Sequence, residues 1–269
     1  MKNEKKSVMG NEIVTAKNPI DLTNVSESYR GKVALESNKI SKTDFDILKK
    51  SCPTNSFDFD AQDNAISIDH GKCISCSNCN YAMPELVKIK NIFAPASKNR
   101  AGLVESFDSL SIEKSYEELG AELKEKIHRL FGRSLAIREV DAGSCNGCEI
   151  EIIALNNPIY DIERFGIHFV ASPRHADLLL VTGPASRNME IALKRTYDAT
   201  PGPKLVVAVG ACACSGGIFG NTYATTGGID NIVPVDVYIP GCPPRPQALI
   251  YGILLAINKK LGSDSDSTK

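Results

Sequence analysis

The sequence predicts an α/β protein with two parts: a C-terminal parallel sheet covered by helices on both faces, and a smaller α+β domain before it. Two observations carry this prediction. Between residues 134 and 258, short apolar runs alternate with segments of helical periodicity, an order typical of parallel sheets. The nine cysteines fall into two groups, one before residue 80 and one after residue 144, which indicates two separate sites.

Strands and helices are expected to alternate in the C-terminal part. Strands are expected at 135–140, 167–170, 177–183, 204–210 and 237–241. Helices are expected at 148–157, 187–199 and 244–258. We therefore interpret residues 134–258 as a flavodoxin-like parallel sheet, a fold in which ligand sites gather outside the carboxyl ends of the strands.

The composition of the 269-residue chain fits two core-forming domains, because 42% of its residues are hydrophobic. Its formal net charge of −1 gives no general attraction to nucleic acid or to anionic lipid. The N-terminus lacks the apolar stretch of a signal peptide. The longest apolar run, Ala248–Ile257, is too short to span a bilayer, so we expect a soluble intracellular protein without a membrane span.

The ends of the chain and its middle segment have different expected characters. Residues 1–28 are polar and lysine-rich and residues 259–269 are of low complexity, so both are expected to be flexible. Residues 96–133 are expected to form a linker and a connecting amphipathic helix, with a capping box at Ser115 and Glu118. The apolar face of this helix, expected to pack on the C-terminal part, consists of Leu119, Leu123, Ile127 and Leu130.

The first cysteine group has the spacing of a bacterial ferredoxin. In the stretch CISCSNC, Cys73, Cys76 and Cys79 lie at intervals of three, and the remote Cys52 precedes a proline. These four cysteines are expected to bind one 4Fe-4S cluster in a ferredoxin-like domain over residues 29–95. Tetrahedral zinc is the alternative. Disulfides are less favoured, because the number of cysteines is odd and no secretory signal is present.

A two-cluster ferredoxin would need a second set of ligands in this domain. The positions for them hold Lys42, Phe45 and Leu48, and Met83 stands where the last cysteine would be. The sequence therefore predicts a single cluster here. His70, just before the motif, is expected to be a surface residue because four cysteines already complete the site.

The second cysteine group lies at the expected ends of strands. Its candidate ligands are Cys145, Cys148, Cys212 and Cys242. Each follows a strand within a few residues, so they are expected to meet at one edge of the sheet, among turns whose amide groups suit an anionic inorganic cluster. A thioredoxin-like dithiol at Cys145 and Cys148 is the main alternative, although it gives the other two no role. Cys214 is expected to point away from Cys212, on an extended or turn segment, and to bind no metal.

Four stretches of the C-terminal part resemble a known family. They are SCNGCEIE, SPRHADLLLVTGP, VGACACSGGIFG and PGCPPRPQAL. They are similar to motifs of the small subunit of membrane-bound, energy-converting nickel–iron hydrogenases, including the formate hydrogenlyase type, and of the related complex I subunit. This resemblance covers residues 134–258 and implies that one 4Fe-4S cluster is held by Cys145, Cys148, Cys212 and Cys242. Complex I has adjacent cysteines where this chain has Cys145-Asn146-Gly147-Cys148, so the hydrogenase branch fits better.

The resemblance also implies a function for an acidic residue. Glu151 matches a glutamate of the family motif, which implies proton coupling near the cluster, and Glu149 lies beside it. Acidic residues at a helix N-terminus are also favourable for structural reasons alone, so both interpretations stay open. The ferredoxin-like domain is a departure, because such a domain commonly belongs to a separate subunit of these complexes.

No Ser-His-Asp arrangement, Walker loop or dinucleotide fingerprint is present, so no site for substrate turnover is expected in this chain. The expected function is electron transfer between two 4Fe-4S clusters, the first expected from the ferredoxin spacing and the second implied by the resemblance. The resemblance also implies that the second cluster faces a partner large subunit with a nickel–iron centre or a quinone site. Other subunits, including membrane subunits, would hold the chain at the cytoplasmic face of the membrane. The alternatives are a complex I-like quinone oxidoreductase subunit and a non-enzymatic iron–sulfur redox sensor.

Overall fold

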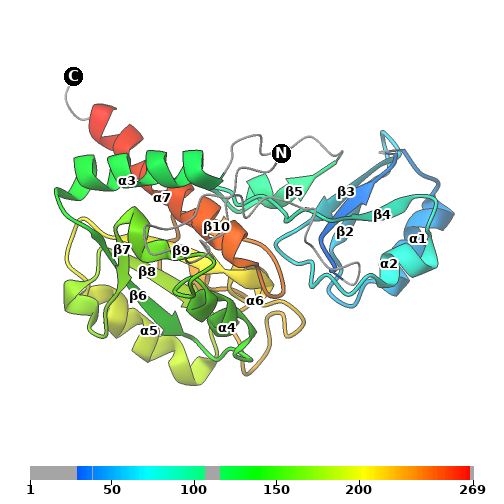
Figure 1. Ribbon diagram of the computed structural model, residues 1–269. Coiled ribbons are helices and arrows are strands. Elements are labelled where there is room, and N and C mark those ends of the chain that lie inside the picture. The colour runs from blue at the N-terminus through cyan, green and yellow to red at the C-terminus, as the bar shows by residue number, and fades with distance from the viewer. Residues whose placement is uncertain (1–28, 38, 107–115, 267–269) are drawn as a thin grey trace, which may run out of the picture.

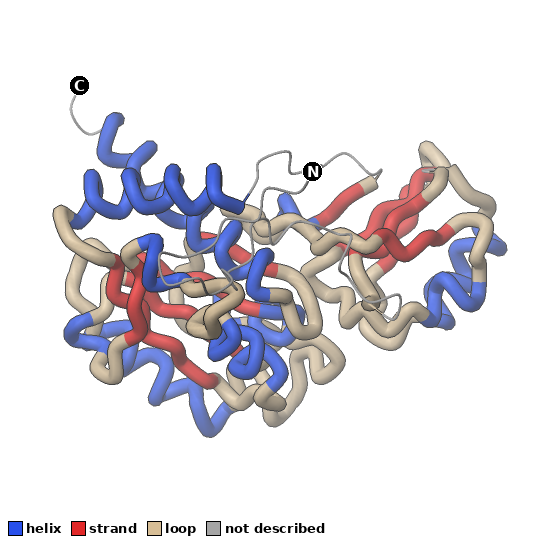
Figure 2. Tube along the Cα trace, viewed as in Figure 1, coloured by secondary structure: helices blue, strands red, loops and turns tan. Residues whose placement is uncertain are grey.

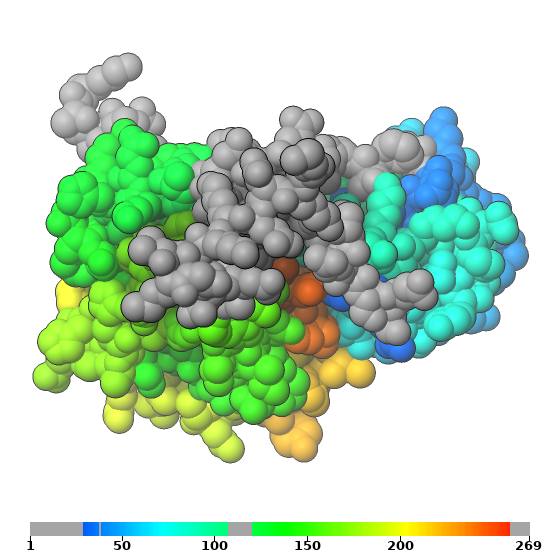
Figure 3. Space-filling view, in the orientation of Figure 1, coloured from blue at the N-terminus to red at the C-terminus, as the bar shows by residue number. Residues whose placement is uncertain are grey.

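The computed structural model describes residues 29–37, 39–106 and 116–266, without the side chains of residues 116–119 and 259–266. The expected flexible segment 1–28 lies outside the described residues. Two units lie side by side, an N-terminal unit of small antiparallel sheets and a C-terminal unit built on a parallel sheet (Figure 1). Figure 3 shows them in contact, with the orange residues that precede and begin the C-terminal helix next to the N-terminal unit.

The C-terminal unit has the predicted fold class. Its strands are β6 (Leu135–Asp141), β7 (Ile167–Phe169), β8 (Leu178–Thr182), β9 (Leu205–Val209) and β10 (Val237–Ile239). All neighbours are parallel, and the order across the sheet is β10-β9-β8-β6-β7. Numbered by their order in the chain and taken from the β7 edge, the strands follow the 2-1-3-4-5 order of flavodoxin-like sheets, so this prediction is confirmed.

Helices cover both faces of the parallel sheet (Figure 2). They are α3 (Tyr116–Phe131), α4 (Gly147–Ala154), α5 (Arg187–Ala199), α6 (Gly210–Ser215) and α7 (Pro246–Asp266). In β8, Leu178 and Leu180 join the core that includes α3 and α7, whereas Leu179 and Val181 join the core that includes α5 and α6. Alternate side chains of one strand thus fill two apolar layers, which explains the uninterrupted apolar runs. Within the described ranges, every helix is too short or too polar to cross a lipid bilayer.

Two helix ends differ from the expected ones. α5 has its predicted range, whereas α4 ends at Ala154 instead of residue 157. The Asn157 side chain accepts hydrogen bonds from the N–H groups of the following turn, and Pro158 cannot continue the helix. α7 continues to Asp266, so the backbone is helical through most of the segment that was expected to be a flexible tail.

The connecting helix α3 packs on the C-terminal unit as expected. Leu123 and Ile127 are buried in the core shared with α7, and Leu130 packs against that core. Gly132 follows the helix with a φ of 65°, a conformation that favours glycine at a helix end. Ser115 lies outside the described residues, as do the side chains of Glu118 and Leu119.

The N-terminal unit has a β-α-β-β-α-β order. Its elements are β1 (Lys32–Leu35), α1 (Lys42–Ser51), β2 (Phe57–Asp60), β3 (Ala65–Asp69), α2 (Asn78–Ala82) and β4 (Val87–Lys90). β1 pairs with β4 and β2 with β3, all antiparallel, and β5 (Val104–Glu105) adds to β3. These elements enclose a separate apolar core. That the unit is a ferredoxin-like domain stays a prediction.

Apolar side chains occupy most of the positions where a second cluster in this unit would need ligands. Leu48 is fully buried in α1, and Met83 packs against the same core. The ring of Phe45 stacks on that of Phe59, with 5.1 Å between their centroids. These positions therefore contribute to the packing of the N-terminal unit.

The segment expected to be a linker is built into both units. Ser97 forms an antiparallel bridge with Tyr238 at the free edge of β10, through backbone hydrogen bonds of 2.9 and 2.8 Å. Leu103 ends a short 3-10 turn, Ala101–Leu103, and is buried in a core of the C-terminal unit. The next two residues form β5 and pair with the N-terminal unit. Residues 97–105 thus tie the two units together.

A buried charged network links β1, β5 and the loop after β3. The ammonium of Lys32, whose side chain is fully buried, lies 2.8 Å from Oε2 of Glu105. Nε2 of His70 lies 2.9 Å from the same oxygen. His70 is only 4% exposed, so the expectation that it is a surface residue is wrong.

Lys32→Met should lower the free energy of unfolding by about 3–5 kcal/mol, because it leaves the Glu105 carboxylate without its buried ammonium partner. Urea unfolding of the purified chain measures this loss. Lys72→Met is the matched control, since the Lys72 side chain is 44% exposed and its ammonium lies 3.8 Å from Asp69. The control should cost at most about 1 kcal/mol. Equal losses in the two variants would contradict a stabilising buried ion pair.

Candidate metal centres

The four cysteines predicted to form the first site lie together in the N-terminal unit. Cys52 directly follows α1, Cys73 and Cys76 lie in the loop after β3, and Cys79 lies in α2. All four line one cavity, which is also bordered by residues of β1, β2 and β3. The ferredoxin-like spacing thus corresponds to a spatial cluster of four thiols.

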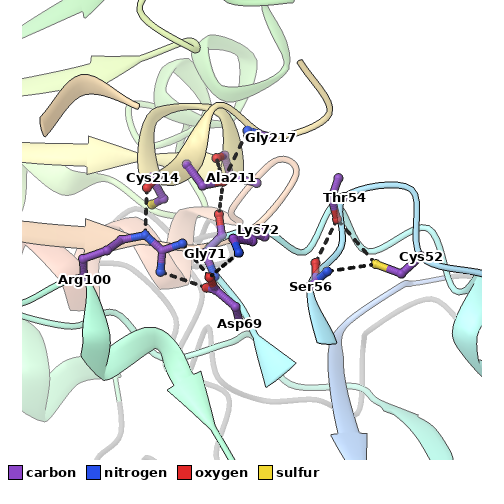
Figure 4. Close-up of polar contacts among 11 residues, drawn as sticks. Cys52, Thr54, Ser56, Asp69, Gly71, Lys72, Arg100, Ala211, Cys214 and Gly217 are labelled. Carbon is purple, nitrogen blue, oxygen red and sulfur yellow. Dashed lines mark hydrogen bonds and ion pairs between the residues drawn. The ribbon is translucent and has the colours of Figure 1, made fainter. Parts of the chain in front are cut away.

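Backbone groups point at two of these sulfurs. The N–H of Ser56 donates to Sγ of Cys52 at 3.3 Å (Figure 4). The N–H of Ser75 donates to Sγ of Cys73 at 3.4 Å. Ser75 has a positive φ of 53°, which turns the loop around the cavity. Such N–H donors favour the thiolate form of cysteine, which is the form that binds metal.

The thiols of the first site would repel one another as anions. Burial is the main cause that raises the pKa of Cys73 to about 12 and that of Cys79 to about 11, and the neighbouring thiolates add to it. Burial also raises the pKa of Cys52, but hydrogen bonds from Ser56 and Thr54 outweigh it, so this pKa is lowered. Four thiolates in one cavity need cationic charge to compensate them, and iron would supply it.

The second set of predicted ligands meets at the carboxyl edge of the parallel sheet. Cys145 precedes α4, Cys148 lies in its first turn, Cys212 lies in α6 after β9, and Cys242 follows β10. Burial is the main cause that raises the pKa of Cys148, and the charges of Glu149 and of the other three cysteines add to it. Cys145 and Cys242 are exposed, whereas Cys148 and Cys212 are half-buried. This site opens to the surface.

Two glycines bring the backbone close to the sulfurs of the second site. A Cβ atom on Gly210 would lie 2.7 Å from Sγ of Cys148, and one on Gly217 would lie 2.9 Å from Sγ of Cys212. Both glycines have positive φ angles, 85° and 55°. Any other residue would be strained there and would fill the space beside the sulfur.

Cys214 differs from the predicted ligands because its thiol faces the interior. The residue is 1% exposed, and its Sγ lies 3.6 Å from the carbonyl oxygen of Ile239. Cys214 lies in helix α6, not on the expected extended or turn segment. Residues two apart on a helix still occupy different faces, which separates this thiol from Cys212.

Each cysteine set offers four thiols, which is the number and kind of donor that a 4Fe-4S cluster takes. The donor sets therefore fit 4Fe-4S clusters. Four thiols also suit tetrahedral zinc, which stays the alternative for the first set. The ligand assignments themselves stay predictions.

Two glutamates lie beside the second site, and a third interacts with one of them. Glu149 accepts a hydrogen bond from the hydroxyl of Thr182, and its other oxygen is buried without a hydrogen-bond partner among the described residues. Burial raises the pKa of Glu151, and Arg245 opposes this. Glu139 is not among the expected site residues, although a carboxylate within the apolar run of β6 is a signal. Burial, and then the charge of Glu149, raise the pKa of Glu139. Proton coupling through Glu149 and Glu151 stays a prediction.

The two sites adjoin each other where the units meet. One cavity is lined by Cys73 from the loop after β3 and by Pro243 from the loop after β10. A second, more open cavity has Ser75 and Cys242 in its walls. Burial is the main cause that raises the pKa of Cys242, and neighbouring thiolates, Cys76 among them, add to it. The loop that carries Cys73 and the loop that carries Cys242 therefore line the same cavities.

The fold and the second site together define an α/β protein whose cysteines gather at the carboxyl edge of a flavodoxin-like sheet. Residues 145–256 match the family described as NADH ubiquinone oxidoreductase, 20 kDa subunit, and the chain belongs to this family. The match begins at Cys145 and includes all four cysteines of the second set. The N-terminal unit lies outside it.

Three relatives share the matched region. A probable membrane-bound hydrogenase subunit of Pyrococcus furiosus is 51% identical over 131 residues, which cover 49% of this chain and 78% of the relative. Formate hydrogenlyase subunit 7 of Escherichia coli is 49% identical over 150 residues, 56% of this chain and 59% of the relative. An NADH-quinone oxidoreductase subunit of Geotalea daltonii is 49% identical over 120 residues, 45% of this chain and 69% of the relative. The resemblance predicted from the motifs is thus confirmed.

Proposed function

We propose that the chain is an iron–sulfur electron-transfer subunit of a nickel–iron hydrogenase-type complex. Two 4Fe-4S clusters would be held, one by Cys52, Cys73, Cys76 and Cys79 and one by Cys145, Cys148, Cys212 and Cys242. The observation that supports this proposal most strongly is that the second set of cysteines gathers at one edge of the sheet, within the region shared with hydrogenase relatives. A bound 4Fe-4S cluster takes up and releases single electrons.

The residues of this chain would prepare both sites for that chemistry. The N–H groups of Ser56 and Ser75 point at ligand sulfurs and stabilise negative charge on them. The loops that carry Cys73 and Cys242 line the same cavities, which favours passage of electrons between the two sites. The exposed thiol of Cys145 marks the open side of the second site, where a partner would exchange electrons with it.

A partner large subunit is expected to cover this open side. Exposed apolar side chains lie on helix α4, which carries Cys148, and on the loop that follows helix α6, which carries Cys212. They are Ile150 and Ile153 in the helix and Ile218, Phe219 and Tyr223 in the loop. Clusters of exposed apolar side chains are typical of surfaces that bind another protein. The aromatic members, of which Tyr223 is 97% exposed, suit the centre of such an interface. The partner's own nickel–iron centre would supply the reaction with H2.

A complex I-like quinone oxidoreductase subunit is the second candidate. The 49% identity to the NADH-quinone oxidoreductase relative over 120 residues favours it. The two residues between Cys145 and Cys148 favour the hydrogenase branch, because complex I has adjacent cysteines at this place. We therefore place the hydrogenase function first.

The purified complex is expected to reduce a dye with H2. This prediction is checked anaerobically on the chain isolated with its partner subunits, after iron and nickel have been measured. Absence of H2-dependent reduction in a fully loaded complex would exclude the hydrogenase function. Quinone reduction by a nickel-free complex would support the second candidate, and isolation without any large subunit would point to a redox sensor.

We infer that the chain associates with the cytoplasmic face of a membrane through partner subunits. A relative is named as part of a membrane-bound hydrogenase, which supports this location. Sedimentation of the chain with membranes in the presence and in the absence of its partners tests the inference. Membrane binding by the chain alone would contradict it.

A further inference from the structure

Arg100 joins the two units through contacts with Asp69 and with the backbone of Cys214 (Figure 4). Its guanidinium donates hydrogen bonds of 2.8 and 2.7 Å to the two carboxylate oxygens of Asp69. Its Nε donates a third, of 2.9 Å, to the backbone carbonyl of Cys214. Asp69 ends β3 in the N-terminal unit, whereas Cys214 lies in α6 of the C-terminal unit. One side chain therefore holds both units.

The two anchor points of Arg100 lie close to ligand cysteines along the chain. Asp69 precedes Cys73 and begins the loop that also carries Cys76. Cys214 shares the six-residue helix α6 with Cys212. A displacement of either anchor would therefore move a predicted ligand with it.

Further hydrogen bonds fix the loop around this contact. Oδ1 of Asp69 also accepts from the N–H of Gly71 at 2.9 Å, so the carboxylate is held by its own loop. The hydroxyl of Ser215 donates to the carbonyl of Gly71 at 2.8 Å, again between the units. The side chains of Arg100 and Asp69 are 26% and 13% exposed, so water screens the pair only in part. The two parallel hydrogen bonds from an arginine to a carboxylate also fix the relative orientation of the two groups, which a single ion pair does not.

We propose that Arg100 and Asp69 are positioning residues that hold the loop carrying Cys73 and Cys76 against helix α6, and so set the separation of the two cysteine sites. The inference rests on the proposed function, because it concerns electron passage between two bound clusters. Both electron transfer and magnetic coupling between reduced clusters weaken steeply as their separation grows. The contact of Arg100 with Asp69 and with the backbone of Cys214 thus fixes the geometry of electron passage between the two units.

EPR spectroscopy of the reduced full chain, isolated anaerobically with its partners, tests the proposal. The wild-type spectrum is expected to show splitting from coupling between the two reduced clusters. Arg100→Ala and Asp69→Asn are expected to keep the iron content and the separate signal of each cluster but to lose this splitting. Asp69→Asn keeps a carbonyl oxygen that can accept from Gly71, so the loop itself stays closed. Intramolecular electron transfer should slow in both variants.

Arg133→Ala is the matched control. Arg133 makes the same bidentate contact, at 2.8 and 2.7 Å, with Asp177 at the amino edge of the parallel sheet, opposite the cysteines. This variant is expected to keep the wild-type splitting. A fully loaded wild type without splitting, or wild-type splitting in Arg100→Ala and Asp69→Asn, would overturn the proposal.

Two further outcomes are equally decisive. Loss of the splitting in Arg133→Ala would overturn the proposal, because the effect would then not be specific to the contact between the units. Loss of iron from Arg100→Ala or Asp69→Asn would overturn it too, since the pair would then be needed to assemble a site instead of to space two sites. A wild-type chain that binds a single cluster would instead contradict the proposed function, and iron analysis detects this separately.

Discussion

Serine at Cys148 or Cys242 is expected to remove the second cluster and to leave the first intact, and serine at Cys52 or Cys76 is expected to do the reverse. The two sets lie in different units, and only the first lines the cavity between β1, the β2-β3 pair and α2. Each 4Fe-4S cluster takes four cysteine sulfurs, so the two sets of cysteines should hold two clusters. The wild-type chain should therefore contain about eight irons and each variant about four. Anaerobic iron and sulfide analysis with EPR measures both the number of clusters and their identity.

Cys214→Ser is the control for this series. Its thiol faces the carbonyl of Ile239 inside the C-terminal unit, and a serine hydroxyl could donate to the same oxygen. The variant should therefore keep its iron, since a fifth thiolate has no vacant iron to bind. Iron loss in Cys214→Ser, or about four irons in the wild type, would show that the ligands have been assigned wrongly.

The parallel sheet could be predicted because its strands are buried on both faces. Leu178–Thr182 is apolar at nearly every position, and alternate residues fill opposite cores, so the run stands out from its polar surroundings. The strands of the N-terminal unit give no such signal. Phe57–Asp60 alternates phenylalanine with aspartate over four residues, which is too short to establish a period. That unit was therefore predicted from cysteine spacing alone.

Contacts between distant residues could not be predicted from the sequence. Arg100 donates to a backbone carbonyl 114 residues away, and any residue at that position would offer the same oxygen. Lys32 and Glu105 are 73 residues apart, and in the sequence they resemble ordinary surface charges. Their contact depends on the arrangement of β1, β3 and β5. The expectation that His70 is a surface residue is wrong for the same reason, because the burial of His70 depends on this network.

The grouping of the cysteines in space is easier to predict from the sequence than the relation between the two groups, and their role as cluster ligands stays a prediction. Cysteines are rare and chemically distinct, and the ends of parallel strands gather at one edge. The approach of the two cysteine-bearing loops depends instead on residues 97–105, which lie in the segment expected to be a linker. The backbone bridge at Ser97 and the burial of Leu103 dock the N-terminal unit beside α6 and the loop after β10.

Gly210→Ala is expected to abolish the second cluster and to spare the first. A Cβ atom at this position would lie 2.7 Å from Sγ of Cys148, and the φ of 85° strains any residue with a side chain. Only one rotatable bond lies between the backbone and the sulfur of Cys148. Any rotation that relieves the contact therefore moves the sulfur, which is the predicted ligand atom. The left-handed conformation adds roughly 1–2 kcal/mol of strain. About four irons should be lost per chain, as measured by iron analysis, while the EPR signal of the first cluster persists.

Gly220→Ala separates the effect of the clash from that of the strain. Gly220 also has a positive φ, 59°, but a Cβ atom there would meet nothing within 4 Å. This variant should therefore lose roughly 1–2 kcal/mol of stability and keep both clusters. Gly217→Ala, whose Cβ would lie 2.9 Å from Sγ of Cys212, should repeat the loss seen at Gly210 through a different ligand. Full iron content in Gly210→Ala and Gly217→Ala would mean that the second cluster does not occupy the space that these glycines leave open.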